Sequence, residues 1–243
     1  MLILAVDTSA IASAALVSDD APAGADIPPA WNAESSAVPR IVAAFATEDT
    51  RSHAEVLAPG IDAILAEAQV TSSDLDAIVV GVGPGPFTGL RSGIVTARTL
   101  SFVWKLPLHG MMSLDAVALS VAGSADAGGE FLVATDARRK EVYWARYRLA
   151  DGTPELVDGP HVGPANELPP LPVCGAGAGL YADVVNAVPE HTRTQPEAGA
   201  LGSLALLRMH AGQPLRDTAP LYLRESDAKV PGPRKRALET GKR

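Results

Sequence analysis

The chain has 243 residues, enough for one large domain or two small ones. Its net charge of −8 disfavours unaided binding to a phosphate backbone, and its single cysteine, Cys174, excludes an internal disulfide. No apolar run approaches the roughly 20 residues of a membrane helix, and the first residues lack the basic start of a signal peptide. We therefore expect a cytoplasmic protein with no membrane-spanning segment.

The first part of the chain predicts four strands and two helices. A β-hairpin comes first, because the turn-forming residues Asp7, Thr8 and Ser9 separate two short apolar runs. The stretch at 18–36 is rich in Ala, Asp and Pro and predicts a long loop. The expected strands cover 2–6, 11–17, 40–47 and 77–82, and the expected helices cover 53–68 and 88–104.

The second part repeats the opening pattern faintly. An expected strand at 131–136 ends in Asp136, and a strand at 141–149 follows a tight turn, much as a turn and a strand follow Asp7. The Pro- and Gly-rich stretch at 150–171 predicts an irregular connection. The remaining expected elements are a short strand at 173–174 and a helix at 200–211.

The glycine-rich corner at 83–86 lies between an expected strand and an expected helix, where a dinucleotide-binding loop would lie. Pro84 and Pro86 lack the backbone N–H groups that such a loop aims at a pyrophosphate, and 101–110 contains no acidic residue. A rigid corner that positions the helix is therefore favoured over a dinucleotide site.

The two turns after the Asp-ended strands are candidate nucleotide sites. Asp7, Thr8 and Ser9 could hold a phosphate or a metal-bound water, or could simply close a turn. The same two interpretations apply to the turn at Asp136. These residues are the candidate site for weak binding of ATP or ADP. No nucleophile–base pair and no His/Cys cluster with metal-ligand spacing is present, so we predict no catalytic residue, no metal site and no required cofactor.

Five stretches taken together resemble the TsaB family. They are 6–9, 51–59, 83–93, 136–143 and 220–224. The resemblance covers nearly the whole chain except the 18–36 loop and the last dozen residues. It implies an α/β, actin-like (ASKHA) fold with two subdomains, each with a central β-sheet flanked by helices. The corresponding boundaries are 1–105 and 106–230, followed by a basic, disordered tail at 231–243.

The resemblance also implies a role as the non-catalytic scaffold of tRNA threonylcarbamoylation. The partners would be the TsaD transferase, the ATPase TsaE and, functionally, a TsaC-type enzyme, with tRNA bound only within the complex. TsaD-like chains carry a metal-binding His-x-x-x-His where Ser113 and Val117 stand here, and neither residue suits a metal. The alternative is an actin-like ATPase or small-molecule kinase that uses Asp7 and Asp136. The peptidase label often given to such chains finds no support in the residues.

The partner surface is expected on the two N-terminal helices. Leu90, Ile94, Ala97 and Trp104 form a stripe that suits the sheet, and Leu57, Ile61 and Ile64 form the corresponding stripe on the first helix. Small residues form a second stripe, which would let another helix approach closely: Gly89, Ser92, Gly93, Thr96 and Thr99, with Ala54 and Ala58 on the first helix. By resemblance these faces pair with TsaD. The alternatives left open are that the small faces pack only within this chain, and that the chain alone forms a homodimer.

Overall fold

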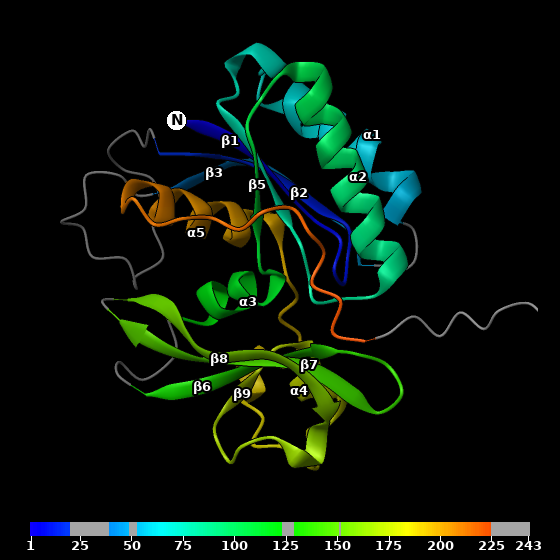
Figure 1. Cartoon of the computed structure of the whole chain (residues 1–243), viewed down its shortest axis with the longest axis vertical. Helices are drawn as coiled ribbons and strands as arrows, with labels where there is room; N and C mark the ends of the chain where they lie inside the picture. The colour runs from blue at the N-terminus through cyan, green and yellow to red at the C-terminus, as the bar shows by residue number, and fades with distance from the viewer. Residues whose placement is uncertain (20–38, 49–52, 123–128, 151, 225–243) are drawn as a thin grey trace, which may run out of the picture.

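The computed structural model describes residues 1–19, 39–48, 53–122, 129–150 and 152–224. Most of the expected loop at 18–36, the side chain of Ala54 and the tail at 231–243 lie outside the described residues. The described chain forms two β-sheet layers, and helix α3 (Ser113–Val121) lies between them (Figure 1). None of the helices in this part of the chain is long and apolar enough to cross a membrane.

Sheet A, the upper layer in Figure 1, has five strands. They are β1 (Leu2–Asp7), β2 (Ser13–Ser18), β3 (Arg40–Ala46), β4 (Ala77–Gly81) and β5 (Leu108–Met111). Their order is β3-β2-β1-β4-β5, with β1, β4 and β5 parallel and β2 antiparallel to both neighbours. Because helices cover both faces, β1, β2 and β4 are apolar and buried along almost their whole length.

Sheet B repeats this topology in shorter form. Its strands are β6 (Glu130–Asp136), β7 (Glu141–Ala150), β8 (Thr153–Pro164) and β9 (Val173–Cys174), in the order β8-β7-β6-β9. As in sheet A, the first strand pairs antiparallel with the second and parallel with the fourth. Asp7 and Asp136 therefore end equivalent strands, and the expected actin-like α/β fold is confirmed.

The helices enclose sheet A from both sides. Helices α1 (His53–Glu67) and α2 (Phe87–Trp104) cover one face, and α5 (Ala198–His210) covers the other together with α3. The short helix α4 (Ala176–Leu180) packs on sheet B. Short 3-10 turns lie at η1 (Ser72–Asp74), η2 (Ala165–Glu167) and η3 (Pro189–His191). The predicted sheet-facing stripes are confirmed, since their members lie in the core: Leu57, Ile61, Ile64, Leu90, Ile94 and Ala97, with Trp104 partly buried against them.

The expectation of an irregular connection at 150–171 was wrong, because β8 occupies 153–164. Pro154 and Pro160 make this strand hard to predict from the sequence, since proline is depleted in sheets. Among the described strands β8 pairs only with β7, so it lies at a sheet edge, where a missing N–H need not break a ladder. Strand β5 and helix α3 were not predicted. Helix α3 is buried on nearly every side, so its sequence lacks the periodicity of a half-exposed helix.

The predicted subdomain boundary after residue 105 does not coincide with the division of the chain between sheet A and sheet B. Strand β5 pairs with β4 and so belongs to sheet A, although it comes after that boundary. Helix α5 also returns from sheet B to cover sheet A, packing Leu201 and Leu204 against Ile3 and Val17. The physical reason is that the second face of sheet A would otherwise expose its apolar side chains to water.

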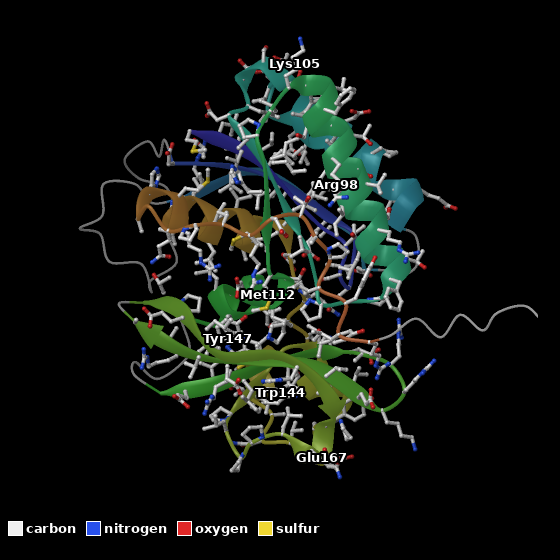
Figure 2. All side chains as sticks on the ribbon, in the orientation of Figure 1. Arg98, Lys105, Met112, Trp144, Tyr147 and Glu167 are labelled. Atoms are coloured by element: carbon white, nitrogen blue, oxygen red, sulfur yellow. The ribbon has the colours of Figure 1, made fainter. Side chains whose placement is uncertain are left out.

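A buried carboxylate ties the two layers together. Asp115 of α3 is 2% exposed and accepts hydrogen bonds from the Tyr147 hydroxyl on β7 and the Arg208 guanidinium on α5, both at 2.8 Å. Tyr147 and Met112 face this inter-layer region (Figure 2). Burial, reinforced by the Asp115 charge, raises the pKa of Tyr147 well above its ordinary value. Each oxygen of the buried Asp115 carboxylate thus has a hydrogen-bond donor, and the Arg208 guanidinium balances its charge.

Replacing Tyr147 by Phe tests this tie. The change removes one donor from the buried Asp115 carboxylate, and we expect the free energy of unfolding to fall by about 1–3 kcal/mol. Urea denaturation followed by circular dichroism measures it. The matched control is Tyr222→Phe, because the Tyr222 hydroxyl accepts an exposed hydrogen bond from Arg91. An equal, small effect of both substitutions would contradict the assigned role of Asp115.

Candidate functional site

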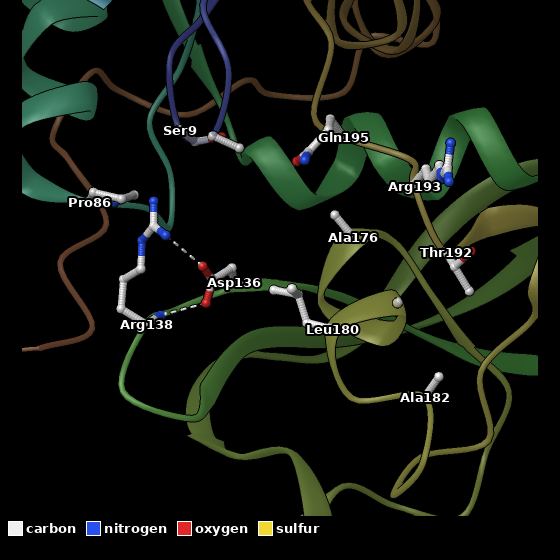
Figure 3. Close-up of a pocket in the computed structure, with 12 residues that line it drawn as sticks. Ser9, Pro86, Asp136, Arg138, Ala176, Leu180, Ala182, Thr192, Arg193 and Gln195 are labelled. Atoms are coloured by element: carbon white, nitrogen blue, oxygen red, sulfur yellow. Dashed lines mark hydrogen bonds and ion pairs between the residues drawn. The ribbon is translucent and has the colours of Figure 1, made fainter. Parts of the chain in front are cut away.

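A cleft of about 610 Å³ lies between the two layers. Ser9 and Pro86 line it from the sheet A side, and Asp136, Arg138 and Leu180 line it from the sheet B side (Figure 3). It thus lies at the ends of the two equivalent strands, β1 and β6. The structure brings together residues from the two turns that the sequence marked as candidate nucleotide sites.

The Asp7 carboxylate does not line this cleft. One of its oxygens accepts hydrogen bonds from the Ser9 backbone N–H at 2.8 Å and the Ser9 hydroxyl at 2.7 Å. The other accepts from the Ser113 hydroxyl at 2.5 Å, and Ser113 in turn accepts from the Gly83 N–H at 3.1 Å. Asp7 and Ser113 are fully buried. The carboxylate therefore joins the hairpin turn, the corner before α2 and the start of α3.

Asp136 lies at the equivalent position but faces the cleft. Its carboxylate accepts a hydrogen bond from the Arg138 N–H at 2.7 Å and forms an ion pair with the Arg138 guanidinium at 3.2 Å (Figure 3). Of the four candidate nucleotide residues, Ser9 and Asp136 line the cleft, whereas Asp7 and Thr8 are buried beneath it. The Ser9 hydroxyl is itself committed to Asp7, so among these four residues only the paired Asp136 carboxylate offers an exposed reactive group.

Thr8 fastens the hairpin turn to helix α2. Its hydroxyl donates to the Gly89 carbonyl at 2.7 Å and accepts from the Gly93 N–H at 3.1 Å, so it spans one helical turn. A side chain at Gly93 would overlap Thr8. Both glycines are buried here, and the expectation that they face a partner is corrected: Gly93 leaves room for Thr8, and the Gly89 carbonyl accepts the Thr8 hydrogen bond.

The outer face of α1 and α2 holds the other predicted partner residues. Thr99 and Ala58 are exposed, and Ser92 and Thr96 are half-buried. Three large apolar side chains that the sequence analysis overlooked lie on the exposed side of α2: Val95, Phe102 and Val103, with exposed fractions of 59%, 84% and 63%. Their spacing could have revealed this face in the sequence, because positions 95, 99 and 102 recur at helical intervals on the side away from Leu90 and Ile94.

The residues at the two positions compared with a His-x-x-x-His motif are both buried in α3. Ser113 bonds to Asp7, and Val117 packs in the apolar core between α3 and sheet B. Within the described part of the chain, no group of three or more His, Cys, Asp or Glu residues is placed to hold a metal ion. The interior around α3 is therefore filled by hydrogen bonds and apolar contacts.

Comparison with known proteins identifies the family to which this chain belongs. The sequence profile of the family described as "TsaD: tRNA N6-adenosine threonylcarbamoyltransferase" matches residues 40–175. An uncharacterized protein of Mycobacterium tuberculosis is 44% identical over 186 residues, which cover 75% of this chain and 80% of that protein. "tRNA threonylcarbamoyladenosine biosynthesis protein TsaB" of Escherichia coli is 37% identical over 98 residues, covering 40% of this chain and 42% of that protein. The chain belongs to the TsaB family.

A solved structure of a TsaB-like chain extends the match to the whole fold. The structure titled "YeaZ from Pseudomonas aeruginosa" superposes with a TM-score of 0.69 and 27% sequence identity, covering 91% of this chain and 99% of that one. The similarity therefore includes both layers and the helices between them. The resemblance to the TsaB family, expected from five motifs, is therefore confirmed and extends to the overall fold.

Substitution of Gly93 by Ala tests the Thr8 contact. The added methyl group overlaps the Thr8 hydroxyl, so we expect the free energy of unfolding to fall by about 1–3 kcal/mol. Gly163→Ala is the matched control, because nothing lies within 4 Å of the added atom, and its effect should stay within about 0.5 kcal/mol. Thermal melting of both variants measures the difference in stability. A stable Gly93→Ala protein would mean that α2 does not approach Thr8 this closely.

Cys174 provides a test for a hidden nucleophile. Burial, with a smaller contribution from the Glu190 charge, raises the pKa of the Cys174 thiol to about 11. The folded chain should therefore react with iodoacetamide at about pH 8 roughly 100-fold more slowly than the urea-unfolded chain, since the thiolate is the reactive form. Mass spectrometry of the alkylated protein measures both rates. Rapid alkylation of the native chain would reveal an activated, accessible cysteine.

Proposed function

We propose that this TsaB-family chain acts in tRNA threonylcarbamoyladenosine biosynthesis as the non-catalytic partner of a TsaD transferase. The names of its relatives support the pathway. The single observation that carries the partner role is the apolar outer face of α2. TsaE and a TsaC-type enzyme belong to the same proposal, as does the expectation that tRNA meets this chain only within the complex.

The outer face of α2 has the character of a helix-packing surface. Val95, Thr99 and Phe102 lie on one side at helical spacing, and the 84% exposure of Phe102 leaves most of a large aromatic side chain in water. Contiguous exposed apolar patches on otherwise soluble folds commonly mark protein–protein contacts. Ser92 and Thr96 keep the neighbouring stripe small, which suits close approach by a partner helix. The same face would support homodimers when no partner is present.

The non-catalytic role is supported by how the reactive groups are used. Asp7 is saturated by donors from Ser9 and Ser113, so it is poorly placed to orient a metal-bound water. The Cys174 thiol is buried and protonated near neutral pH. The specific observation that favours the alternative, an actin-like ATPase or kinase, is that the cleft brings Ser9 opposite Asp136.

Nucleotide titration separates the two functions. We expect the isolated chain to bind MgATP or ADP weakly and to show no turnover above buffer, because the cleft keeps only a paired carboxylate for acid–base work. Isothermal titration calorimetry and phosphate release are the measurements. Tight, stoichiometric binding with turnover that Asp136→Asn abolishes would establish the enzyme instead.

Charging the outer face of α2 tests the partner surface. Val95→Glu places a carboxylate where an apolar partner face would strip its water, so capture of co-expressed TsaD should fall at least about tenfold. Val184→Glu is the matched control, because Val184 is also an exposed valine, 56% against 59%, but lies in the sheet B subdomain. Thermal melting should show both variants folded. Intact capture by a folded Val95→Glu protein would place the interface elsewhere.

A further inference from the structure

The C-terminal strap, residues 216–224, runs beside α2 and holds two arginines of that helix. The Arg91 Nε–H donates a hydrogen bond to the Tyr222 hydroxyl at 3.0 Å. The Arg98 guanidinium donates twice to Thr218, from Nε to the hydroxyl at 3.1 Å and from Nη2 to the carbonyl at 2.9 Å. Figure 1 shows the orange strap passing the helix, and Figure 2 shows Arg98 on it. Both arginines are exposed, so each is held in place at the protein surface.

The strap is anchored to the fold without these arginines. Arg216 exchanges two backbone hydrogen bonds with Gly110 of β5, at 2.8 and 3.0 Å. The Leu221 N–H donates to the Val82 carbonyl at 2.8 Å, and the Leu221 side chain packs against the apolar cores of both layers. The strap is therefore a fixed support for the two arginines and does not depend on them for its own position.

Two aromatic rings restrict the Arg91 guanidinium further. Its Cζ atom lies 5.7 Å from the centre of the Phe87 ring and 5.8 Å from the centre of the Tyr222 ring. The two rings contact each other, with their centres 4.6 Å apart. Contacts between a guanidinium and aromatic rings orient the cation and leave its outer N–H groups able to donate. A side chain restricted in this way loses less conformational entropy when a ligand pairs with it.

No carboxylate compensates the two charges. In the part of the chain that the structure describes, the ion pairs of arginines involve other arginines than these two. Helix α2 itself carries no acidic side chain. Both Nη groups of Arg91 and the Nη1 group of Arg98 are outside the hydrogen bonds to the strap. These donors are therefore placed to meet an anionic group of another molecule.

The two arginines alternate with the apolar side chains of the α2 outer face. Positions 91, 95, 98 and 102 are separated by four, three and four residues, so they follow one side of the helix. Val95 and Phe102 are the exposed apolar members of this row, at 59% and 84%. A helix packed along the row would meet cationic and apolar groups in turn. Its complement is a helix whose apolar side chains are bordered by Asp or Glu.

We propose that Arg91 and Arg98 bind carboxylates of a partner helix that docks on the outer face of α2. This inference rests on the proposed function, which supplies that partner as TsaD, and it adds the chemistry by which the partner is recognised. Planar guanidinium groups donate paired hydrogen bonds to carboxylate oxygens. Exposed ion pairs usually contribute little because both side chains must be ordered, whereas the strap has already ordered these two.

The experiment measures the association and dissociation rates of purified TsaD and this chain by biolayer interferometry. The double variant Arg91→Gln with Arg98→Gln removes both charges. At about 0.05 M salt we expect its association rate constant to be at least about tenfold below that of the parent chain. At about 0.5 M salt the difference should shrink to less than about threefold, because salt screens the attraction.

A second double variant, Arg91→Lys with Arg98→Lys, separates charge from geometry. Lysine keeps the positive charge but lacks the planar group that pairs with a carboxylate, the strap and the rings. Its association rate constant should stay within about threefold of the parent value, while its dissociation should be about tenfold faster. Thermal melting should show both double variants folded, since the strap keeps its backbone anchors.

Arg148→Gln is the matched control. Arg148 is an exposed arginine of β7 in sheet B, and its guanidinium pairs with Glu155 at 3.0 Å. The substitution changes the net charge by the same amount as one substitution on α2. Both rate constants should stay within about twofold of the parent values, because the change lies away from the partner surface.

Two results would overturn the inference while pairing with TsaD remains intact. The first is association of the glutamine variant at the parent rate in low salt. The second is identical kinetics of the glutamine and lysine variants, which would limit the arginines to their contacts with the strap. Failure of the parent chain to bind TsaD would instead contradict the proposed function, and the inference with it.

Discussion

The Asp7 carboxylate is the contact on which the arrangement of this protein depends. It gathers the Ser9 turn, the Ser113 start of α3 and, through Ser113, the Gly83 corner that leads into α2. A buried carboxylate without donors would be strongly destabilising, so the three segments must stay together for the fold to persist. Gly81 fits the same constraint, because a side chain there would overlap both the Asp7 carboxylate and the Ser113 hydroxyl. The strand end that could have served catalysis thus serves as a structural junction.

The position of α2 follows from this junction. Gly83 fixes the corner before the helix, and Thr8 then bonds to two backbone groups on its first turns. With that side of α2 held against the hairpin, Val95 and Phe102 must face outward. The described part of the C-terminal segment runs from α2, where Tyr222 contacts Arg91, to the β6–β7 turn, where Arg224 contacts Ala137. The exposed apolar face of α2 and the β6–β7 turn are thereby linked through one segment.

The sequence was sufficient to predict the elements whose local pattern matches their surroundings. The hairpin, both N-terminal helices and their sheet-facing stripes, and the repeat of β1–β2 in β6–β7 were predicted correctly. Helix α3 was missed because burial on all sides erases amphipathic periodicity, and β8 was missed because prolines are tolerated at an edge. The roles of Gly89 and Gly93 were missed because nothing local shows that Thr8, about 80 residues away, inserts against them.

Reconstituted tRNA modification is the decisive measurement for the non-catalytic partner role. The assay combines a TsaD-type transferase, TsaE, a TsaC-type enzyme, tRNA, threonine, bicarbonate and ATP, with and without this chain. Threonylcarbamoyladenosine should form only when the chain is added, and a chain carrying Asp136→Asn in the cleft should support its formation as well as the parent does. Loss of modification by Asp136→Asn while it still binds TsaD, or full modification without the chain, would contradict a non-catalytic partner role.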